Sequence, residues 1–161
     1  MKKIKVLFVC LGNICRSPLA EAIFKHKVSQ KGLQHLVTAD SCGTANYHVG
    51  DAPDPRTIAN AKRNGVMIDH IGQQLSLQHL ADFDFILAMD KGNHQNILKL
   101  HDAEKYNSKV MLMRSFDQAR QHDEVPDPYY GHERDFQQVF EILDQSVESF
   151  IEFLKKEHFR V

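Results

Sequence analysis

The sequence predicts an α/β domain in which a parallel sheet is covered by helices on both faces. Short apolar runs alternate along the chain with segments of helical periodicity, which is the order that βαβ units require. The first of these runs is continuously apolar, as expected for a strand buried on both faces. The chain has 161 residues and no obvious linker, so we expect one domain covering residues 1–161.

The first elements can be placed from local signals. Ile4–Cys10 is the continuous apolar run and predicts the first strand. Ser17 precedes Pro18, and apolar residues then recur at helical spacing. We therefore expect a helix with Ser17 as its N-cap, Pro18 at its first position and Glu21 as the acidic residue that the helix dipole favours in the first turn. The next apolar segment predicts a second strand that ends near Ser41.

The rest of the chain continues this alternation, with a long polar loop before the last helix. The predicted elements are helices over Arg56–Asn64, Asn93–Leu100 and Phe136–Lys155 and strands over Asp84–Asp90 and Lys109–Phe116. In open parallel sheets, ligands bind outside the carboxyl ends of the strands. Cys10 and the long loop after the fourth strand belong to that edge, so we expect the functional site there.

Composition excludes several classes of function. The formal net charge of −1 gives no electrostatic reason to expect nucleic acid or an anionic membrane as a partner. The apolar run behind the basic start is too short for a signal peptide or a membrane span. Three cysteines do not indicate a disulfide framework, so we expect a reducing, cytoplasmic setting. The ten histidines are scattered and no HExxH or paired CxxC spacing occurs, so we expect no metal and no cofactor.

The loop after the first strand has the composition of an anion site. It contains Leu11, Gly12, Asn13, Ile14, Cys15, Arg16 and Ser17. A loop between a strand and a helix N-terminus directs several backbone N–H groups into one concavity. We expect Gly12 and Asn13 to supply the unusual backbone angles that such a loop needs. The loop is not of the Walker type, because Cys10 begins it and Arg16 closes it.

Cysteine and arginine at this spacing indicate phosphoryl chemistry. Arginine offers a planar fork that matches two phosphate oxygens, and cysteine offers a nucleophile that the same groups would stabilise as a thiolate. Either residue alone is more often structural, but Cys-x5-Arg-Ser between a strand and a helix is specific. Departure of a phenolate also needs a proton donor. Asp127 in "DPYY" is the candidate, although the same segment could simply form a turn, and Asp90 and Asp54 are the next choices.

The segments "VLFVCLGNICRSPLAEAIF" and "DPYYG" together resemble the low-molecular-weight protein tyrosine phosphatases. The similarity extends through "DSCGT", "PDPRT", "GVMIDH" and "FDFILAMD" and covers nearly the whole chain. The resemblance implies a four-stranded parallel sheet in a flavodoxin-like arrangement with the phosphate-binding loop after the first strand. It implies that Cys10 is the nucleophile, Arg16 binds phosphate and Asp127 is the general acid. It further implies that the loop is supported by Asn13, Ser17, Ser41 and His70 and that the pocket is walled by Leu11, Tyr47, Tyr129 and Tyr130.

The expected activity is hydrolysis of protein tyrosine phosphate and small aryl phosphates through a cysteinyl-phosphate intermediate. A thiol-dependent arsenate reductase is one alternative, but no cysteine follows Cys42. A non-catalytic phosphotyrosine-binding module is the other, although binding alone would need no acid. Cys15 is expected to act as a redox partner of Cys10. The expected partner is a tyrosine-phosphorylated protein such as a tyrosine kinase, and the oligomeric state stays open between monomer and weak dimer.

Overall fold

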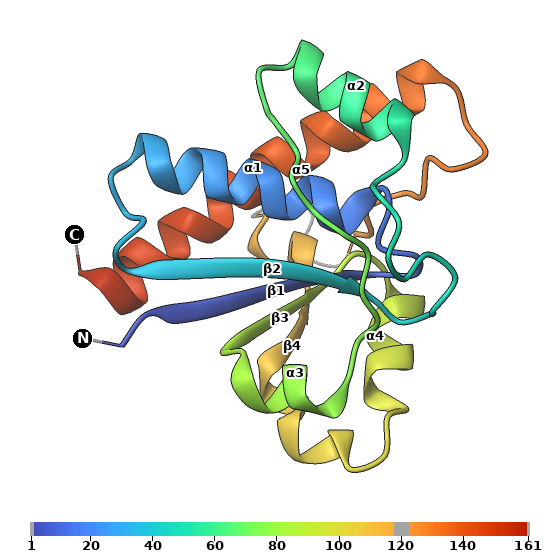
Figure 1. Cartoon of the computed structure of the whole chain (residues 1–161). Coiled ribbons are helices and arrows are strands. Elements are labelled where there is room, and N and C mark those ends of the chain that lie inside the picture. Colours follow the sequence, from blue (N-terminus) through green and yellow to red (C-terminus); the bar gives the residue numbers. More distant parts are fainter. Residues whose placement is uncertain (1, 118–122, 161) are drawn as a thin grey trace.

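The computed structural model describes residues 2–117 and 123–160. Four parallel strands form one sheet in the order β2-β1-β3-β4 (Figure 1). The strands are β1 (Ile4–Cys10), β2 (Val37–Gly43), β3 (Phe85–Ala88) and β4 (Val110–Leu112). The strand order reverses direction at β1, so the crevice at the carboxyl end of β1 is a topological switch point. The predicted α/β class with a parallel sheet is confirmed.

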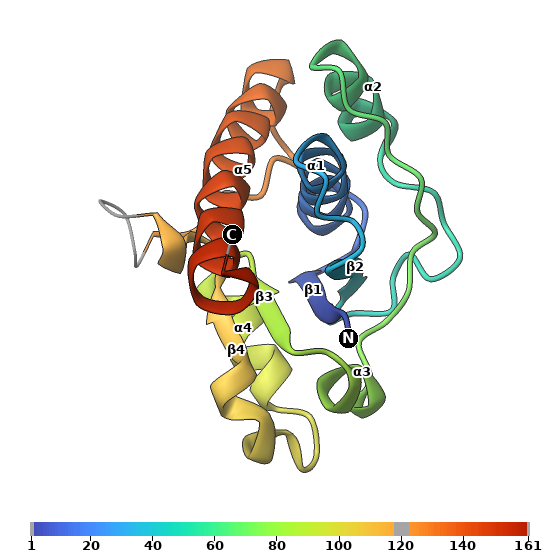
Figure 2. The ribbon, with the colours of Figure 1, turned by 90° about the vertical axis from the view of Figure 1, so that its left-hand side faces the viewer.

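Helices cover both faces of the sheet (Figure 2). One side carries α1 (Arg16–Gln30) and α5 (Glu133–Leu154), with α2 (Pro55–Arg63) packed against them. The other side carries α3 (Leu77–Asp82) and α4 (Lys91–Leu98). Short helical turns of other types cover Ala103–Lys109, Met113–Phe116 and Lys155–Phe159. No helix in the described part of the chain combines the length and apolar character that a membrane span requires.

The alternation of side chains along β1 divides the core into two halves. Phe8 points to the side of α1 and α5, where its ring lies 5.6 Å from that of Phe24, which in turn lies 5.8 Å from that of Phe150. Leu7 and Val9 point to the opposite side, into the cluster around α3 and α4. Burial of each such side chain stabilises the fold by about 1.5–3 kcal/mol. Because β1 is fixed on both faces, the position of Cys10 at its end is fixed as well.

The structure corrects several predicted boundaries. Helix α1 begins at Arg16, so the prediction of Ser17 as N-cap was wrong, and Cys15 takes that place without a capping hydrogen bond. The Ser17 hydroxyl faces the Cys10 sulfur instead. Glu21 consequently lies in the second turn, where it is buried and cannot serve the helix dipole as expected.

The other differences lie at short elements. The fourth strand is limited to β4, because the chain turns into a helical segment at Met113. The six-residue helix α3 was not predicted, since it is too short to show a period. Helix α5 begins three residues earlier than expected. The first five residues of the predicted polar loop lie outside the described residues.

Candidate active site

A cavity of about 320 Å³ opens at the carboxyl end of β1. It is bounded by the loop that follows β1, by the segment around Tyr47 and by the loop that precedes α5. The lining residues are Cys10, Leu11, Gly12, Ile14, Cys15, Arg16, Tyr47, His48, Asp127, Tyr129 and Tyr130. Three segments that are distant in the sequence therefore meet around one thiol.

The Cys10 sulfur lies among hydrogen-bond donors. It is 2.9 Å from the Ser17 hydroxyl, and the backbone N–H of Asn13 donates to it over 3.3 Å. The thiol is 3% exposed, and α1 starts directly behind the loop with its N-terminus toward the site. Donors and the positive end of a helix dipole both favour negative charge at this position.

Asn13 supplies the unusual backbone angle of the loop. Its φ is 58°, whereas Gly12 has no positive φ, so the prediction for Gly12 was wrong in this respect. At Gly12 space is limited, because a Cβ there would lie 3.2 Å from Cδ2 of His48 and would displace that ring slightly. The ring of His48 is thereby packed against the loop at the wall of the cavity.

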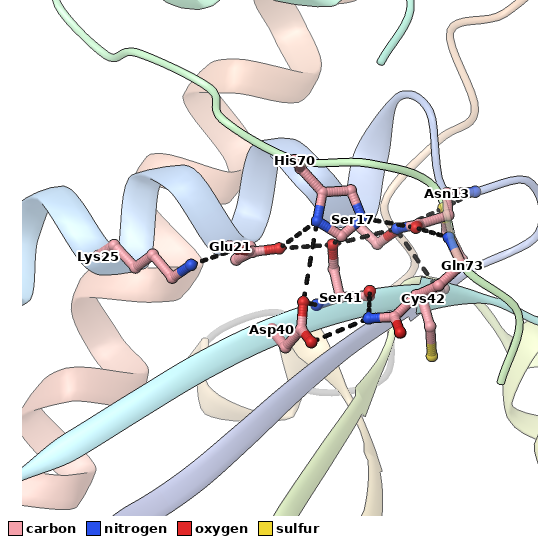
Figure 3. Close-up of polar contacts among 10 residues, drawn as sticks. Asn13, Ser17, Glu21, Lys25, Asp40, Ser41, Cys42, His70 and Gln73 are labelled. Atoms are coloured by element: carbon pink, nitrogen blue, oxygen red, sulfur yellow. Dashed lines mark hydrogen bonds and ion pairs between the residues drawn. The ribbon is translucent and has the colours of Figure 1, made fainter. Parts of the chain in front are cut away.

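The side chain of Asn13 is held from two directions (Figure 3). Its Nδ2 donates to the hydroxyls of Ser17 over 2.8 Å and Ser41 over 3.1 Å. Its Oδ1 accepts from the backbone N–H of Gln73 over 3.0 Å and lies 2.7 Å from Nε2 of His70. Since the Gln73 N–H can only donate, the orientation of the amide is fixed, and His70 donates through Nε2.

Glu21 forms the far end of this network (Figure 3). Its Oε1 accepts from the Ser41 hydroxyl over 2.7 Å and lies 3.2 Å from Nδ1 of His70. Burial disfavours the charged form of Glu21, but hydrogen bonds from His70 and Lys25 outweigh burial and lower the pKa of this carboxyl. The network thus runs from a buried carboxylate to the residue that shapes the loop.

Arg16 connects the loop to Asp90, which follows β3, and to the segment that precedes α5. Its guanidinium is 3% exposed, and Nη1 donates to Asp90 Oδ2 over 2.7 Å and to the Val125 carbonyl over 3.0 Å. Burial alone would lower the pKa of Arg16, but the neighbouring Cys10 sulfur and Asp90 outweigh it and raise the pKa. Its Nη2 lies 3.6 Å from Oδ2 of Asp127. Arg16 therefore lies between the thiol and the candidate acid.

Asp127 stands at the rim of the cavity and is 47% exposed. Its Oδ1 accepts the backbone N–H of Tyr129 over 3.1 Å, which fixes the turn. The rings of Tyr129 and Tyr130 lie 5.0 Å apart at 89°. Tyr47 and Leu11 line the cavity as well, and all four side chains are exposed at its mouth.

The two remaining cysteines lie in different places. Cys15 is buried but lines the cavity, and burial raises the pKa of its thiol to about 12. Cys42 lies on β2 in the core cluster on the opposite face of the sheet. All three cysteines are free thiols.

Several residues of the site were not predicted from the sequence. Glu21 follows Ser17 by four positions on α1, so helical spacing could have placed it behind the loop. Asp90 was considered as an acid, but it binds Arg16 and caps α4 through Asn93. Gln73 and His48 come from irregular segments that carry no periodic signal.

One group of potential metal ligands occurs within residues 2–117 and 123–160. The ligand atoms of Glu21, Asp40 and His70 lie within 4.8 Å of one another. These residues already make hydrogen bonds or ion pairs among themselves and with Ser41 and Gln73. We therefore assign no ion to this group.

The fold and this loop together define the class of the protein, a phosphatase built on a doubly wound α/β domain. The model of the family described as low molecular weight phosphotyrosine protein phosphatase matches residues 5–160, and the chain belongs to this family. The predicted family and the hydrolysis of tyrosine phosphate are thereby confirmed.

Individual relatives agree with this assignment. The chain is 47% identical to the low molecular weight phosphotyrosine protein phosphatase of Schizosaccharomyces pombe, over 81% of this chain and 83% of that protein. It is 41% identical to the corresponding protein of Saccharomyces cerevisiae, over 96% of both chains. The crystal structure of a protein tyrosine phosphatase from Entamoeba histolytica superposes with a TM-score of 0.89 at 38% identity, covering 99% of this chain and 100% of that one.

Proposed function

We propose that the enzyme hydrolyses phosphotyrosine by two transfers of the phosphoryl group, first to Cys10 and then to water. The observation that carries this proposal is the arrangement of three groups around one cavity. The Cys10 sulfur and the Arg16 guanidinium share a loop, and the Asp127 carboxylate lies 3.6 Å from that guanidinium. A nucleophile, an anion-binding group and an acid thus face the same space.

In the first step, the Cys10 thiolate attacks phosphorus and the bond to the tyrosine oxygen breaks. Arg16 and the backbone N–H groups of the loop hold the non-bridging oxygens, whose charge they stabilise throughout the transfer. Asp90 and the Val125 carbonyl hold Arg16 in place, so its fork needs little reorganisation when phosphate arrives.

Asp127 acts on the leaving oxygen. It gives its proton to the departing phenolate, and afterwards it takes a proton from the water that attacks the phosphocysteine. Its exposed position at the rim supports this role, because the leaving oxygen of an inserted aryl phosphate lies at the rim rather than at the bottom. The Ser17 hydroxyl lies 2.9 Å from the sulfur, so it can donate to a thiolate there and stabilise it as the leaving group of the second step.

The mouth of the cavity favours an aryl ester. Tyr47, Tyr129 and Tyr130 expose ring faces around it, and Leu11 adds an apolar surface. Aromatic rings prefer such edge-to-face and stacked contacts with one another. Phosphotyrosine therefore meets a complementary wall that an alkyl phosphate would not use.

The experiment that tests the mechanism is rapid acid quenching of the enzyme with an aryl phosphate, followed by peptide mass spectrometry. We expect phosphate on Cys10 of the native enzyme and none in Cys10→Ser treated in the same way. Cys10→Ser should still bind vanadate, because the loop and Arg16 remain. Turnover at the native rate in Cys10→Ser would contradict the proposal.

We also propose a tyrosine-phosphorylated protein in the cytoplasm, such as a tyrosine kinase, as the physiological substrate. The free thiols support a reducing compartment. Capture of phosphoproteins by Asp127→Ala, followed by their identification, would test this assignment. Sedimentation of the purified enzyme would decide between a monomer and a weak dimer.

A further inference from the structure

We infer that Arg56 is a positioning residue that ties the phosphate-binding loop to the turn carrying Asp127. The inference rests on the proposed role of Asp127 as general acid. Arg56 lies on α2 and touches neither the thiol nor the cavity floor. Through its guanidinium and its partner Asp54, Arg56 connects α2 to the phosphate-binding loop, to the turn with Tyr129 and to Phe136 of α5.

The connection to the loop runs through Asp54. The backbone N–H of Asp54 donates to the carbonyl of Ile14 over 2.8 Å, so the start of α2 is fastened to the phosphate-binding loop. The carboxylate of Asp54 is 8% exposed and caps α2 by accepting the Arg56 N–H over 2.8 Å. These two hydrogen bonds fix the position of Asp54 relative to the loop.

The carboxylate of Asp54 fixes the guanidinium of Arg56 in a two-point contact. Nε of Arg56 donates to Oδ1 over 3.0 Å, and Nη2 donates to Oδ2 over 2.8 Å. Paired donors of this kind set the plane of the guanidinium as well as its position. The hydrogen bonds from Arg56 lower the pKa of Asp54, so this carboxyl stays charged at neutral pH.

The fixed guanidinium faces two aromatic rings. Its central carbon lies 5.4 Å from the ring centroid of Tyr129 and 4.7 Å from that of Phe136. Both distances are within the range of cation–π attraction. Phe136 is buried in α5 and gives the guanidinium a fixed contact, whereas Tyr129 belongs to the wall of the active site.

Tyr129 in turn contacts the candidate acid, Asp127. Its backbone N–H donates to Oδ1 of Asp127 over 3.1 Å, so displacement of Tyr129 also shifts the carboxylate that must reach the leaving oxygen. A small displacement of a catalytic group costs a large factor in rate. Arg56 therefore positions Asp127 for proton transfer, although it does not line the cavity that takes the phosphate.

The test compares two substrates in one set of variants. Arg56→Gln should lower kcat/KM about tenfold for phenyl phosphate, whose poor leaving group needs the acid, and less than about twofold for 2,4-dinitrophenyl phosphate. The ratio of kcat/KM for phenyl phosphate to kcat/KM for 2,4-dinitrophenyl phosphate does not depend on the fraction of folded enzyme. Arg56→Lys keeps the charge but loses the planar fork, so it should recover only part of the loss.

Arg63→Gln is the matched control. Arg63 also lies on α2 and pairs with Glu133 of α5 over 2.6 Å, but it has no contact with Tyr129 or Asp54 among the described residues. The ratio for Arg63→Gln should equal that of the native enzyme. If the effect came from a general loss of contact between α2 and α5, the ratio would change alike in Arg56→Gln and Arg63→Gln.

A double substitution separates this inference from the proposed function. In the Asp127→Ala background, Arg56→Gln should no longer change the ratio, because the group that it positions is gone. Suppose that Arg56→Gln lowers kcat/KM equally for both substrates while Asp127→Ala lowers it mainly for phenyl phosphate. In that case the inference about Arg56 is wrong and the role of Asp127 stands. If Asp127→Ala itself is not selective, the assignment of the acid fails and this inference fails with it.

Discussion

Asn13 and His70 are joined by a hydrogen bond of 2.7 Å between Oδ1 and Nε2, although 57 positions separate them in the sequence. Asn13 is the residue of the loop with a left-handed backbone, and His70 is in turn within 3.2 Å of the buried Glu21. The conformation of the phosphate-binding loop is therefore set by side chains that lie behind it.

Substitution of Asn13 should separate its backbone role from its side-chain role. Asn13→Gly accepts a positive φ but loses the hydrogen bonds, which we expect to cost about 1–3 kcal/mol of stability. Asn13→Ala loses the same bonds and adds about 1–2 kcal/mol for a left-handed alanine. Urea unfolding of both variants measures the difference. Equal stabilities would show that the positive φ imposes no strain.

Replacement of Glu21 should change the acid stability of the enzyme. The pKa of this carboxyl is lowered below the ordinary value of 4.5 on folding. Its ionised form therefore adds stability that is fully present above about pH 4.5 and is lost as the pH falls through the folded-state pKa. Glu21→Gln should lose about 1.5–3 kcal/mol at pH 7 and should show a weaker decline of stability below pH 4.5.

Glu148 provides a control for this measurement. Its pKa is also lowered, chiefly by Lys31, but its side chain is 39% exposed in an ion pair between α1 and α5. Glu148→Gln should cost no more than about 1 kcal/mol, because surface pairs are screened by solvent. A cost for Glu148→Gln equal to that for Glu21→Gln would argue against a special role of the network.

Replacement of Asp127 should reveal its role through the leaving group. Asp127→Ala should lower kcat for phenyl phosphate by about 10²–10⁴-fold, because the phenolate must leave without a proton. The loss should be much smaller for 2,4-dinitrophenyl phosphate, since that phenolate needs no proton to leave. Steady-state rates with both substrates measure the difference. Equal losses would make Asp127 a structural residue.

Peroxide should inactivate the enzyme reversibly through Cys15. Oxidation of the Cys10 thiolate gives a sulfenic acid and hydroxide, and attack by Cys15 then forms a disulfide and releases water. The thiol of Cys15, with a pKa of about 12, is almost wholly protonated at neutral pH. We therefore expect disulfide formation to accelerate about tenfold for each pH unit above neutrality, as the thiolate fraction rises.

Two variants test the disulfide. In Cys15→Ser, activity should recover poorly with dithiothreitol, because Cys10 becomes over-oxidised. Cys42→Ser should behave like the native enzyme, since Cys42 lies in the core on the opposite face of the sheet. Mass spectrometry of the oxidised enzyme detects the linkage. Absence of a Cys10–Cys15 bond, with unchanged recovery in Cys15→Ser, would rule out this mechanism.

The sequence by itself determined the features that depend on neighbouring residues. The apolar run of β1, the loop after it and the helix behind the loop are local, so their order and most of their bounds could be predicted. Cys10 and Arg16 fall within one such unit, and their chemistry follows from residue type and spacing. The motif also carried the resemblance to the family, which the comparisons then confirmed.

Only the tertiary structure shows how distant groups, some of which the family resemblance had already implied, are brought to the site. The order β2-β1-β3-β4 places the ends of β2 and β3 on either side of Cys10, so Ser41 and Asp90 reach the loop from opposite sides. The partnership of Arg56 with Tyr129 depends on how α2 packs against α5. Such contacts arise from packing between segments that are far apart in the chain. A short stretch of sequence is compatible with many packing partners, so no periodic or local signal predicts these contacts.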